Sequence, residues 1–511
     1  MRPIVRLCLP VLALLVSACA ELPQRPELPP QVAVPVGSGT RLDSLIAPEE
    51  EKHPGAAGFH LISTGPEAFA VRARTAHLAE RSLDVQTYIW NNDLTGKYLA
   101  YALLTAADRG VKVRLLVDDM DARDKNYGFA ALDAHPNIEV RMFNPMPSRS
   151  GTLAFIGDFL GSGKRLNHRM HNKTWIADNR IAIVGGRNLG DEYFGASEDV
   201  NFVDLDFAMV GPVVREASAS FDKYWNSRAV YPIALLSPEG VTPEVLEKLR
   251  KSTGQAAEEG KTSSYAELLK RDDAVERLVA GDRPFEWSTD FQFVSDDPLK
   301  ALKEMGLEKS DVLSVLVPVL KSAQRYETLV SPYFVPGKRG TDFFVERAQE
   351  GRQVRILTNS LAANDVAAVH GGYSQYRKDL LKGGVKLWEL KPLPGLKSKA
   401  SMFGSSGASL HTKALVVDGQ RLFVGSYNLD PRSTALNCEQ GVLVTSSALG
   451  GQFEQIFEQQ SDGARAWRVS LVDGDLSWTD GKTTYDRDPL ATAGQRFQAW
   501  LARVLPIESQ L

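Results

Sequence analysis

One arrangement of polar residues occurs twice in this 511-residue chain, and it constrains the fold more than any other feature. The first copy consists of His171, Lys173, Asp178, Gly185, Gly186 and Asn188. The second consists of His411, Lys413, Asp418, Gly425, Ser426 and Asn428. Each position of the second copy follows its counterpart by 240 residues (411 minus 171, for example). A constant spacing in two otherwise diverged segments predicts two similar lobes that each contribute one motif.

Length and composition agree with two globular lobes. One hydrophobic core rarely serves more than about 250–300 residues, so 511 residues predict more than one. Hydrophobic residues make up 43% and charged residues 24%, which excludes disorder over most of the chain. The net charge of −4 implies no polyanion-binding surface and disfavours a nucleic-acid partner. Three scattered cysteines exclude a disulfide framework or a cysteine-based metal site.

The N-terminus is typical of an exported protein. Arg2 and Arg6 precede an apolar run at 7–16, so residues 1–18 are interpreted as a cleaved signal peptide, too short for a permanent span. Val16-Ser17-Ala18-Cys19 resembles a bacterial lipoprotein box, in which the cysteine is acylated; an ordinary signal or short anchor with an incidental cysteine is the alternative. We expect a lipid anchor at Cys19, facing the periplasm. The outer membrane is slightly favoured, because no retention aspartate follows Cys19.

Hydrophobic periodicity places strands and helices in alternation on both sides of a polar middle. The boundaries are a Pro-rich tether at 19–58, a first lobe at 59–232, a helical connector of unknown function at 233–290, and a second lobe at 291–505. The first lobe is predicted to alternate helix 66–81, strand 83–90, a second helix that ends at about residue 109, and strand 111–117. The second lobe is predicted to repeat this with strand 328–334, helix 342–350 and strand 354–358. The fold class is therefore α/β, with two lobes that each contain a mixed sheet flanked by helices and that share one active site.

The repeated residues suit chemistry at a phosphate. A histidine and a lysine two positions apart on extended chain point to the same side. An ammonium group holds anionic oxygens, while an imidazole supplies covalent or proton chemistry. The glycine pairs allow close backbone approach, and the amides of Asn188 and Asn428 can donate to the same oxygens. Two facing copies would place His171 and His411 on opposite sides of one phosphorus.

Carboxylates elsewhere have two predicted roles. A catalytic histidine needs an acceptor on its second nitrogen, and Asp204 and Glu439, each before a similar strand, are the candidates, with Asp206 as the alternative. Asp178 and Asp418 are expected to brace the structure behind the site. The roles of His168 and His370 remain open, with His370 a candidate for the substrate pocket. No ligand pattern predicts a metal or another cofactor.

This double motif resembles the signature of the phospholipase D superfamily. The surrounding chain, including residues 357–365 and 370–373, more narrowly resembles bacterial cardiolipin synthases of type C, within the phosphatidylserine/phosphatidylglycerophosphate/cardiolipin synthase family. The resemblance covers residues 59–505, and it departs at Gly186-Arg187, where a Ser-containing pair is more usual.

The resemblance implies phosphatidyl transfer without a cofactor. His171 would attack phosphorus to form a phosphohistidine, and His411 would act as acid and then base; the reverse assignment is open. Lys173, Lys413, Asn188 and Asn428 would hold the phosphoryl oxygens. The product would be cardiolipin, made from phosphatidylglycerol and either a second phosphatidylglycerol or phosphatidylethanolamine.

Other functions fit parts of the same pattern. Water as the acceptor would make the protein a phospholipase D-type hydrolase. A nuclease-like phosphodiesterase is disfavoured by charge, and a non-catalytic envelope lipoprotein by two intact motifs. Loops 149–169 and 391–403 mix apolar and cationic residues before each motif histidine, which suits a membrane surface with anionic lipids; loops packed on the body are the alternative. The oligomeric state is not predicted.

Overall fold

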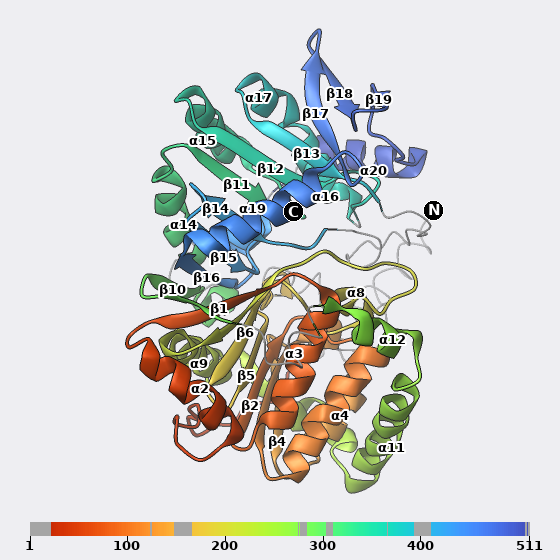
Figure 1. Ribbon diagram of the computed structural model, residues 1–511. Helices are drawn as coiled ribbons and strands as arrows, with labels where there is room; N and C mark the ends of the chain where they lie inside the picture. The colour runs from red at the N-terminus through yellow and green to blue at the C-terminus, as the bar shows by residue number, and fades with distance from the viewer. Residues whose placement is uncertain are drawn as a thin grey trace, which may run out of the picture.

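The computed structural model describes residues 22–122, 125–147, 166–273, 275, 284–302, 310–364, 366–392, 410–505 and 508. The predicted signal peptide and Cys19 lie outside these residues, as do most of loops 149–169 and 391–403. Figure 1 shows two lobes, each built on its own sheet and placed one above the other.

The first lobe contains a nine-stranded mixed sheet in the order β8-β4-β3-β2-β5-β6-β7-β1-β9. The neighbours β2, β3 and β4 are parallel, and the remaining pairs are antiparallel. The strands are β1 (Ala57–Ile62), β2 (Ser82–Thr87), β3 (Lys112–Asp118), β4 (Ile138–Phe143), β5 (Thr174–Ala177), β6 (Ile181–Gly185), β7 (Asp206–Val210), β8 (Val230–Pro232) and β9 (Glu286–Ser288).

The second lobe repeats this topology in a ten-stranded sheet, in the order β10-β16-β15-β14-β11-β12-β13-β17-β18-β19. The strands are β10 (Phe291–Ser295), β11 (Tyr326–Val330), β12 (Gln353–Asn359), β13 (Lys386–Leu390), β14 (Ala414–Val417), β15 (Arg421–Gly425), β16 (Gln440–Thr445), β17 (Ala466–Val472), β18 (Asp475–Thr479) and β19 (Thr484–Tyr485). The run β16-β15-β14-β11-β12-β13 matches β7-β6-β5-β2-β3-β4 in order and direction. The predicted α/β fold with two similar lobes is thereby confirmed.

Helices cover both sheets. In the first lobe they are α2 (Arg41–Lys52), α3 (Gly65–Leu78), α4 (Leu94–Asp108), α5 (Asp119–Ala122), α6 (Asn126–Asp133), α8 (Asp191–Phe194), α9 (Pro212–Trp225), α10 (Ile233–Leu236), α11 (Pro243–Gly260) and α12 (Ser264–Arg271). In the second they are α14 (Asp311–Lys321), α15 (Gly337–Gln349), α16 (Ala367–Ser374), α17 (Arg377–Lys382), α18 (Pro431–Ala435), α19 (Ser447–Ser461) and α20 (Ala493–Val504). Short 3-10 turns occur at Pro238–Gly240 and Pro298–Leu302.

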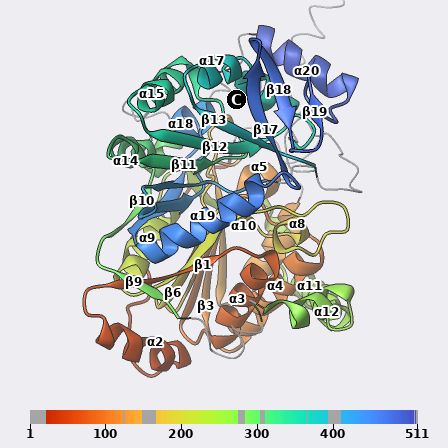
Figure 2. The same cartoon turned by 45° about the horizontal axis from the view of Figure 1, so that its top comes forward.

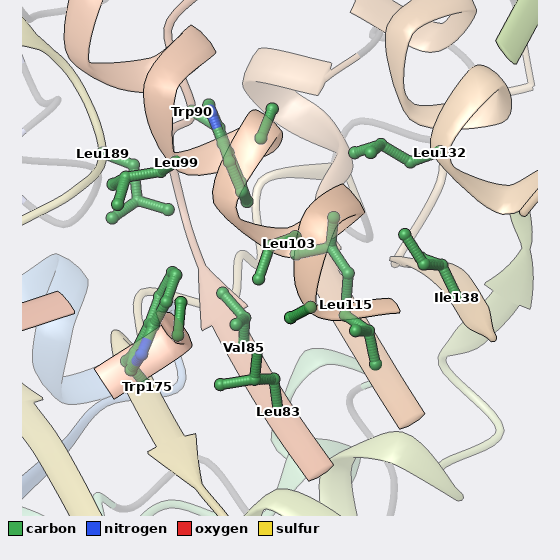
Figure 3. Packing of buried hydrophobic residues seen from close by; sticks show 14 of the residues in the cluster. Leu83, Val85, Trp90, Leu99, Leu103, Leu115, Leu132, Ile138, Trp175 and Leu189 are labelled. Atoms are coloured by element: carbon green, nitrogen blue, oxygen red, sulfur yellow. The ribbon is translucent and has the colours of Figure 1, made fainter. Parts of the chain in front are cut away.

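The two faces of the first sheet belong to different cores. Leu83 and Val85 of β2 point toward Leu103 of α4, as Figure 3 shows. On the neighbouring strand β5, Ile176 points to the opposite face and shares a cluster with Val416 of the second lobe. This second cluster also includes strand residues Val184 and Phe207 from the first lobe and Leu422 and Val424 from the second. The lobes therefore share one hydrophobic core rather than meeting only at their surfaces, because strand alternation gives each sheet two apolar faces.

The structure differs from the expectation of a tether at 19–58. Residues 41–52 form helix α2, whose Asp43 carboxylate accepts hydrogen bonds from Arg81 and Arg180 of the first lobe. Upstream, the Arg25 side chain donates to the carbonyl of Val230 at 2.6 Å. Proline residues lack the N–H group that pairing in a sheet requires. The side-chain hydrogen bonds of Arg25 and Asp43 instead hold this segment along the first lobe.

The segment 233–290 is not only a connector. Helix α11 packs on α4, and α12 packs on α3. The segment then ends in β9, which pairs with β1 at the edge of the first sheet. Within the described residues, no helix combines the length and apolar content that crossing a bilayer requires.

Candidate active site

Each motif occupies the same place in its lobe, immediately before and along a central strand. His171 and Lys173 precede β5, and His411 and Lys413 precede β14. At the far end of each strand the aspartate has positive φ (52° for both Asp178 and Asp418) and begins the turn to the next strand. The histidines therefore lie at one end of each hairpin and the aspartates at the other.

The two aspartates fix these hairpins to the sheet. The Asp178 carboxylate accepts backbone N–H bonds from Glu80, Arg81 and Ser82 at 2.7–3.1 Å, at the start of β2. The Asp418 carboxylate accepts equivalent bonds from the residues that begin β11, at 2.8–3.0 Å; the donors are Gln324, Arg325 and Tyr326. Both carboxylates are engaged by the backbone, which supports a bracing role away from substrate.

Short backbone pairings bring the motifs together across the lobes. The His171 N–H donates to the carbonyl of Cys438 at 2.8 Å, and Met170 bridges Cys438 in parallel. The His411 N–H donates to the carbonyl of Val203 at 2.8 Å, with a parallel bridge beside it. In both places the segment before one lobe's histidine lies against the segment before the other lobe's candidate carboxylate.

The carboxylates are exchanged between lobes. His171 Nδ1 lies 2.9 Å from Glu439 Oε2 of the second lobe. His411 Nδ1 lies 2.6 Å from Asp204 Oδ2 of the first lobe. Sequence reasoning named both carboxylates but could not pair them with their histidines. Asp206, the alternative, instead pairs with Arg72 at 3.0 Å and Arg187 at 3.3 Å.

These contacts define the chemical state of the imidazoles. Glu439 and the carbonyl of Ser426, 3.1 Å from the same nitrogen, can only accept, so Nδ1 of His171 carries the hydrogen and Nε2 keeps its lone pair. Burial lowers the pKa of His171 to about 4, although Glu439 acts in the opposite direction. Burial and the charge of Lys413 hold the pKa of His411 well below its ordinary value. Both rings are therefore neutral at pH 7 in this structure.

The two lysines make the site cationic. Lys173 Nζ donates to the carbonyl of His171 at 2.6 Å, and Lys413 makes the same bond to the carbonyl of His411. Burial and the charge of Lys413 lower the pKa of Lys173 well below its ordinary value. Because the charge of Lys413 disfavours a charged Lys173, the oxygens of a bound phosphate would relieve the repulsion, and the pair suits a phosphate.

The motif glycines Gly185, Gly186 and Gly425 have no room for side chains. A Cβ at Gly186 would lie 2.3 Å from Asp204 Oδ1, and one at Gly425 would lie 2.3 Å from the carbonyl of Gln440. The motif asparagines differ from each other. Asn188 accepts from Ile89 N–H at 3.2 Å and donates to another side chain at the site. Asn428 Oδ1 is buried without a hydrogen-bond partner among the described residues.

The two carboxylates are supported differently. Glu439 accepts hydrogen bonds from the hydroxyls of Ser426 at 2.5 Å and Ser433 at 2.9 Å. In the first motif, the position equivalent to Ser426 is occupied by Gly186. Burial opposes ionisation of Glu439, but the contact with His171, the charge of Lys173 and the Ser426 hydroxyl outweigh it, so the pKa of Glu439 lies below its ordinary value. Burial raises the pKa of Asp204. Its nearest hydrogen bond besides His411 comes from the N–H of Leu205, at 2.8 Å.

Aromatic rings around the histidines escaped sequence reasoning. The ring centroid of Tyr88 lies 5.2 Å from that of His171, in an edge contact. His411 contacts Tyr193 at 5.3 Å and Phe202 at 5.4 Å. Asn188 Nδ2 donates to the Tyr193 hydroxyl at 2.9 Å, which joins that ring to the motif. Tyr88 follows β2, Tyr193 lies on α8 and Phe202 lies outside any helix or strand, so no shared pattern singles these rings out.

The two histidines left open by the sequence are His168 and His370. His168 is buried. His370 lies on α16, with Nε2 3.2 Å from Asp488 Oδ1. His370, Asp488 and Glu389 form a group of potential metal ligands, but the Arg377 guanidinium already donates to Glu389 at 3.1 Å and to Asp488 at 2.8 Å. A cation of the protein itself therefore occupies this cluster.

Comparison with known proteins matches both halves of the chain to one family. The family described as "Cardiolipin synthase, PLD-like domain" matches residues 73–225 and 316–461. Cardiolipin synthase C of Escherichia coli (strain K12) is 39% identical over 480 residues, covering 92% of this chain and 99% of that protein. An uncharacterized protein of Helicobacter pylori (strain ATCC 700392 / 26695) is 33% identical over 404 residues, covering 79% of each chain.

Among solved structures, the phosphatidylserine synthase of Haemophilus influenzae Rd KW20 resembles the whole fold. The TM-score is 0.57 at 13% identity, covering 89% of this chain and 95% of that one, and this likeness shows the fold alone. The matched ranges contain both histidine motifs, and the relative of known name is aligned over almost its full length. The chain is an enzyme and belongs to the phospholipase D-like cardiolipin synthase family.

Proposed function

We propose that this enzyme forms cardiolipin by transferring a phosphatidyl group to phosphatidylglycerol through a phosphohistidine intermediate. The family membership supports phosphatidyl transfer between phospholipids in general terms. The observation that carries the mechanism is the exchanged pair of contacts, His171 with Glu439 and His411 with Asp204. Two imidazoles, each oriented by a carboxylate, suit a reaction with two displacements at one phosphorus.

His171 is the proposed nucleophile. Its partner Glu439 is held ionised by two hydroxyl donors, so the carboxylate can stabilise the positive charge that develops on the ring when Nε2 bonds to phosphorus. In the first displacement the Nε2 lone pair forms the N–P bond while the bond from phosphorus to the leaving alcohol oxygen breaks. The Nδ1 proton stays shared with Glu439 throughout, which keeps the correct tautomer.

His411 is the proposed acid and base. It gives a proton to the leaving alcohol and takes one from the hydroxyl of the incoming phosphatidylglycerol, which then attacks phosphorus and releases His171. Burial and the neighbouring cations disfavour a protonated His411. The negative charge of a bound phosphodiester offsets them and raises the pKa of this ring, so substrate binding itself prepares the acid. The proposed clamp on the phosphoryl oxygens is formed by Lys173, Lys413, Asn188 and Asn428.

The donor is proposed to be a second phosphatidylglycerol or phosphatidylethanolamine. Water competes with the lipid hydroxyl for the phosphohistidine, so transfer requires an active site covered at the membrane surface. We also propose an envelope location with an acylated Cys19 facing the periplasm, supported by the lipoprotein-like box at 16–19. Replacing Cys19 with Ala should prevent acylation and change processing; unchanged processing and detergent partitioning would contradict this location.

Lipid products test transfer directly. Purified enzyme in phosphatidylglycerol vesicles, with and without phosphatidylethanolamine, should produce cardiolipin detectable by mass spectrometry. His171→Ala and His411→Ala should each abolish it. Phosphatidic acid as the dominant product of the unmodified enzyme under both conditions would establish a phospholipase instead.

A soluble phosphodiester separates the two histidines. In bis(p-nitrophenyl) phosphate the leaving group needs no protonation, so His411→Ala should still release a burst of about one nitrophenolate per enzyme and then stall. His171→Ala should show no burst. The opposite pattern would make His411 the nucleophile.

A further inference from the structure

The C-terminal helix α20 turns its large apolar residues away from the protein. Phe497, Trp500, Leu501 and Val504 follow the spacing i, i+3, i+4, i+7, which usually faces a core. These side chains are instead 60%, 52%, 38% and 54% exposed. The rings of Phe497 and Trp500 lie 5.9 Å apart on this face. We call these four residues the α20 stripe.

Small residues hold the opposite side of the helix against the protein. Ala499 and Ala502 are buried and pack on α16, where a Cβ at Gly371 would lie 2.4 Å from the carbonyl of Ala499. The helix is also well formed at its start, because Thr492 and Gln495 make a reciprocal capping box. The α20 stripe is thus not a frayed end, and Figure 2 shows the helix at the outer edge of the second lobe, beyond the β17–β18 hairpin.

The charged residues of helix α20 itself are positive. Helix α20 contains Arg496 and Arg503 and no acidic residue, and Arg503 is exposed. Two more apolar residues, one before and one after the helix, are also exposed, Leu490 at 65% and Leu505 at 44%. An apolar face with aromatic residues and flanking arginines complements the boundary between anionic headgroups and acyl chains.

Helix α20 is joined to the end of the second sheet that carries His411. Asn359, at the carboxyl end of β12, exchanges hydrogen bonds of 3.0 and 3.2 Å with the backbone of Leu410, the residue before His411. Two residues further, the carbonyl of Leu361 accepts a bond from Gln495 of α20 at 3.3 Å. A short, rigid path thus links the α20 helix to the catalytic end of the second sheet.

We infer that α20 is a docking helix that seats the enzyme on a bilayer containing anionic phospholipid. Phe497, Trp500, Leu501 and Val504 enter the acyl boundary, and Arg503 binds headgroup phosphates. This inference rests on the proposed function in one respect, because the proposed lipid substrates are the reason why the enzyme needs a membrane. Docking itself is a binding event that can be measured without turnover.

Vesicle flotation tests the stripe. The full chain carrying Cys19→Ser, which removes the proposed acyl anchor, is mixed with vesicles of phosphatidylcholine containing phosphatidylglycerol or lacking it. Phe497→Ser, Trp500→Ser and Leu501→Ser together should weaken binding at least tenfold. The matched control replaces three exposed apolar residues of the first lobe, Val32, Leu45 and Leu268, with Ser and should bind as the parent does. Equal binding by the two triple variants would overturn the inference.

Two further measurements keep the test decisive. Arg503→Gln should reduce the preference for phosphatidylglycerol-containing vesicles, and no change would contradict the headgroup contact. Lipids brominated on the acyl chain should quench part of the tryptophan emission, and Trp500→Phe should remove that part while vesicle binding persists. Quenching unaffected by Trp500→Phe would overturn the inference even if the triple variant failed to fold.

The outcomes also separate docking from chemistry. The α20 triple variant should hydrolyse the soluble phosphodiester at the parent's rate while losing activity on vesicles. Failure of lipid transfer with intact docking would reject the proposed function alone. A dimer in gel filtration that the triple variant dissolves would show that a second copy covers the stripe, and would overturn membrane docking.

Discussion

His171 of the first lobe donates its Nδ1 hydrogen to Glu439 of the second lobe, at 2.9 Å and across 268 residues of sequence. The reciprocal contact joins His411 to Asp204. Each lobe therefore holds the other lobe's motif imidazole in its orientation. Neither motif histidine contacts its candidate carboxylate within its own lobe, and the core shared between the sheets keeps the two halves in register.

Removing an orienting charge should impair the chemical step. Glu439→Gln and Asp204→Asn retain shape but replace the acceptor facing Nδ1 with a group that can donate, so the wrong tautomer becomes accessible. We expect kcat to fall by about a hundredfold or more, with a small change in KM. Glu454→Gln, which removes a carboxylate that pairs with Arg355 at 2.6 Å, is the control. Full activity in either orienting variant would argue against exchanged positioning.

A methyl group at Gly186 should displace Asp204. The added Cβ of Gly186→Ala would lie 2.3 Å from Asp204 Oδ1, so the carboxylate must move away from His411. We expect loss of most activity and a decrease of about 1–3 kcal/mol in the free energy of unfolding, measured by urea denaturation. Gly451→Ala, on α19 with no atom within 4 Å of its added Cβ, is the matched control and should be neutral or stabilising. Wild-type activity in Gly186→Ala would contradict this tight packing.

Asp178 should matter for stability more than for catalysis. Asp178→Asn removes the negative charge and replaces Oδ2, which accepts from the Glu80 N–H at 3.0 Å, with an NH2 group that cannot accept. We expect a loss of about 2 kcal/mol in the free energy of unfolding, while kcat at low temperature changes only a few-fold. Asp342→Asn, in an exposed pair with Lys338, should shift stability far less. A large fall in kcat without a loss of stability would indicate that Asp178 takes part in the chemical step.

The buried imidazole of His171 should make the fold sensitive to acid. Its folded pKa of about 4 lies below the unfolded value of 6.5, so from pH 6.5 down to 4 the unfolded chain binds a proton that the native state does not. Stability should fall as pH falls through this window, by up to about 1.4 kcal/mol per pH unit. His171→Gln should show a shallower decline in urea titrations at pH 4–6.5. An identical slope would mean that the native ring is protonated normally.

Catalysis should not depend on a divalent ion. The proposed phosphate clamp consists of lysine and asparagine side chains, so EDTA should leave turnover of the soluble phosphodiester unchanged. A soluble substrate is needed because divalent ions also alter lipid packing. Activity that disappears with EDTA and returns with added Mg²⁺ would require a different site chemistry.

Local pattern was enough to place the repeated elements. The chain after each motif histidine was expected to be extended, and strands β5 and β14 occur there. In an extended chain, side chains two positions apart share a face, so the pattern also predicted that each histidine and lysine point to the same side. The constant spacing of 240 residues predicted two lobes of similar topology, and the strand order shows them. The sequence pattern did not predict that residues 22–58 pack on the first lobe. Side-chain hydrogen bonds to distant residues hold this segment, and its local sequence does not reveal them.

Other features depended on contacts between distant parts of the chain. The sequence determined that His171, His411, Asp204 and Glu439 are present and that each histidine needs an acceptor. It could not determine which carboxylate serves which histidine, because that depends on how the two sheets pack. The helical spacing at 497–504 likewise determined an apolar stripe. The side to which this stripe faces depends on packing, because α16 leaves room only for the face of α20 that carries Ala499 and Ala502. Periodicity fixes relative positions within an element, and only packing between elements fixes what each face meets.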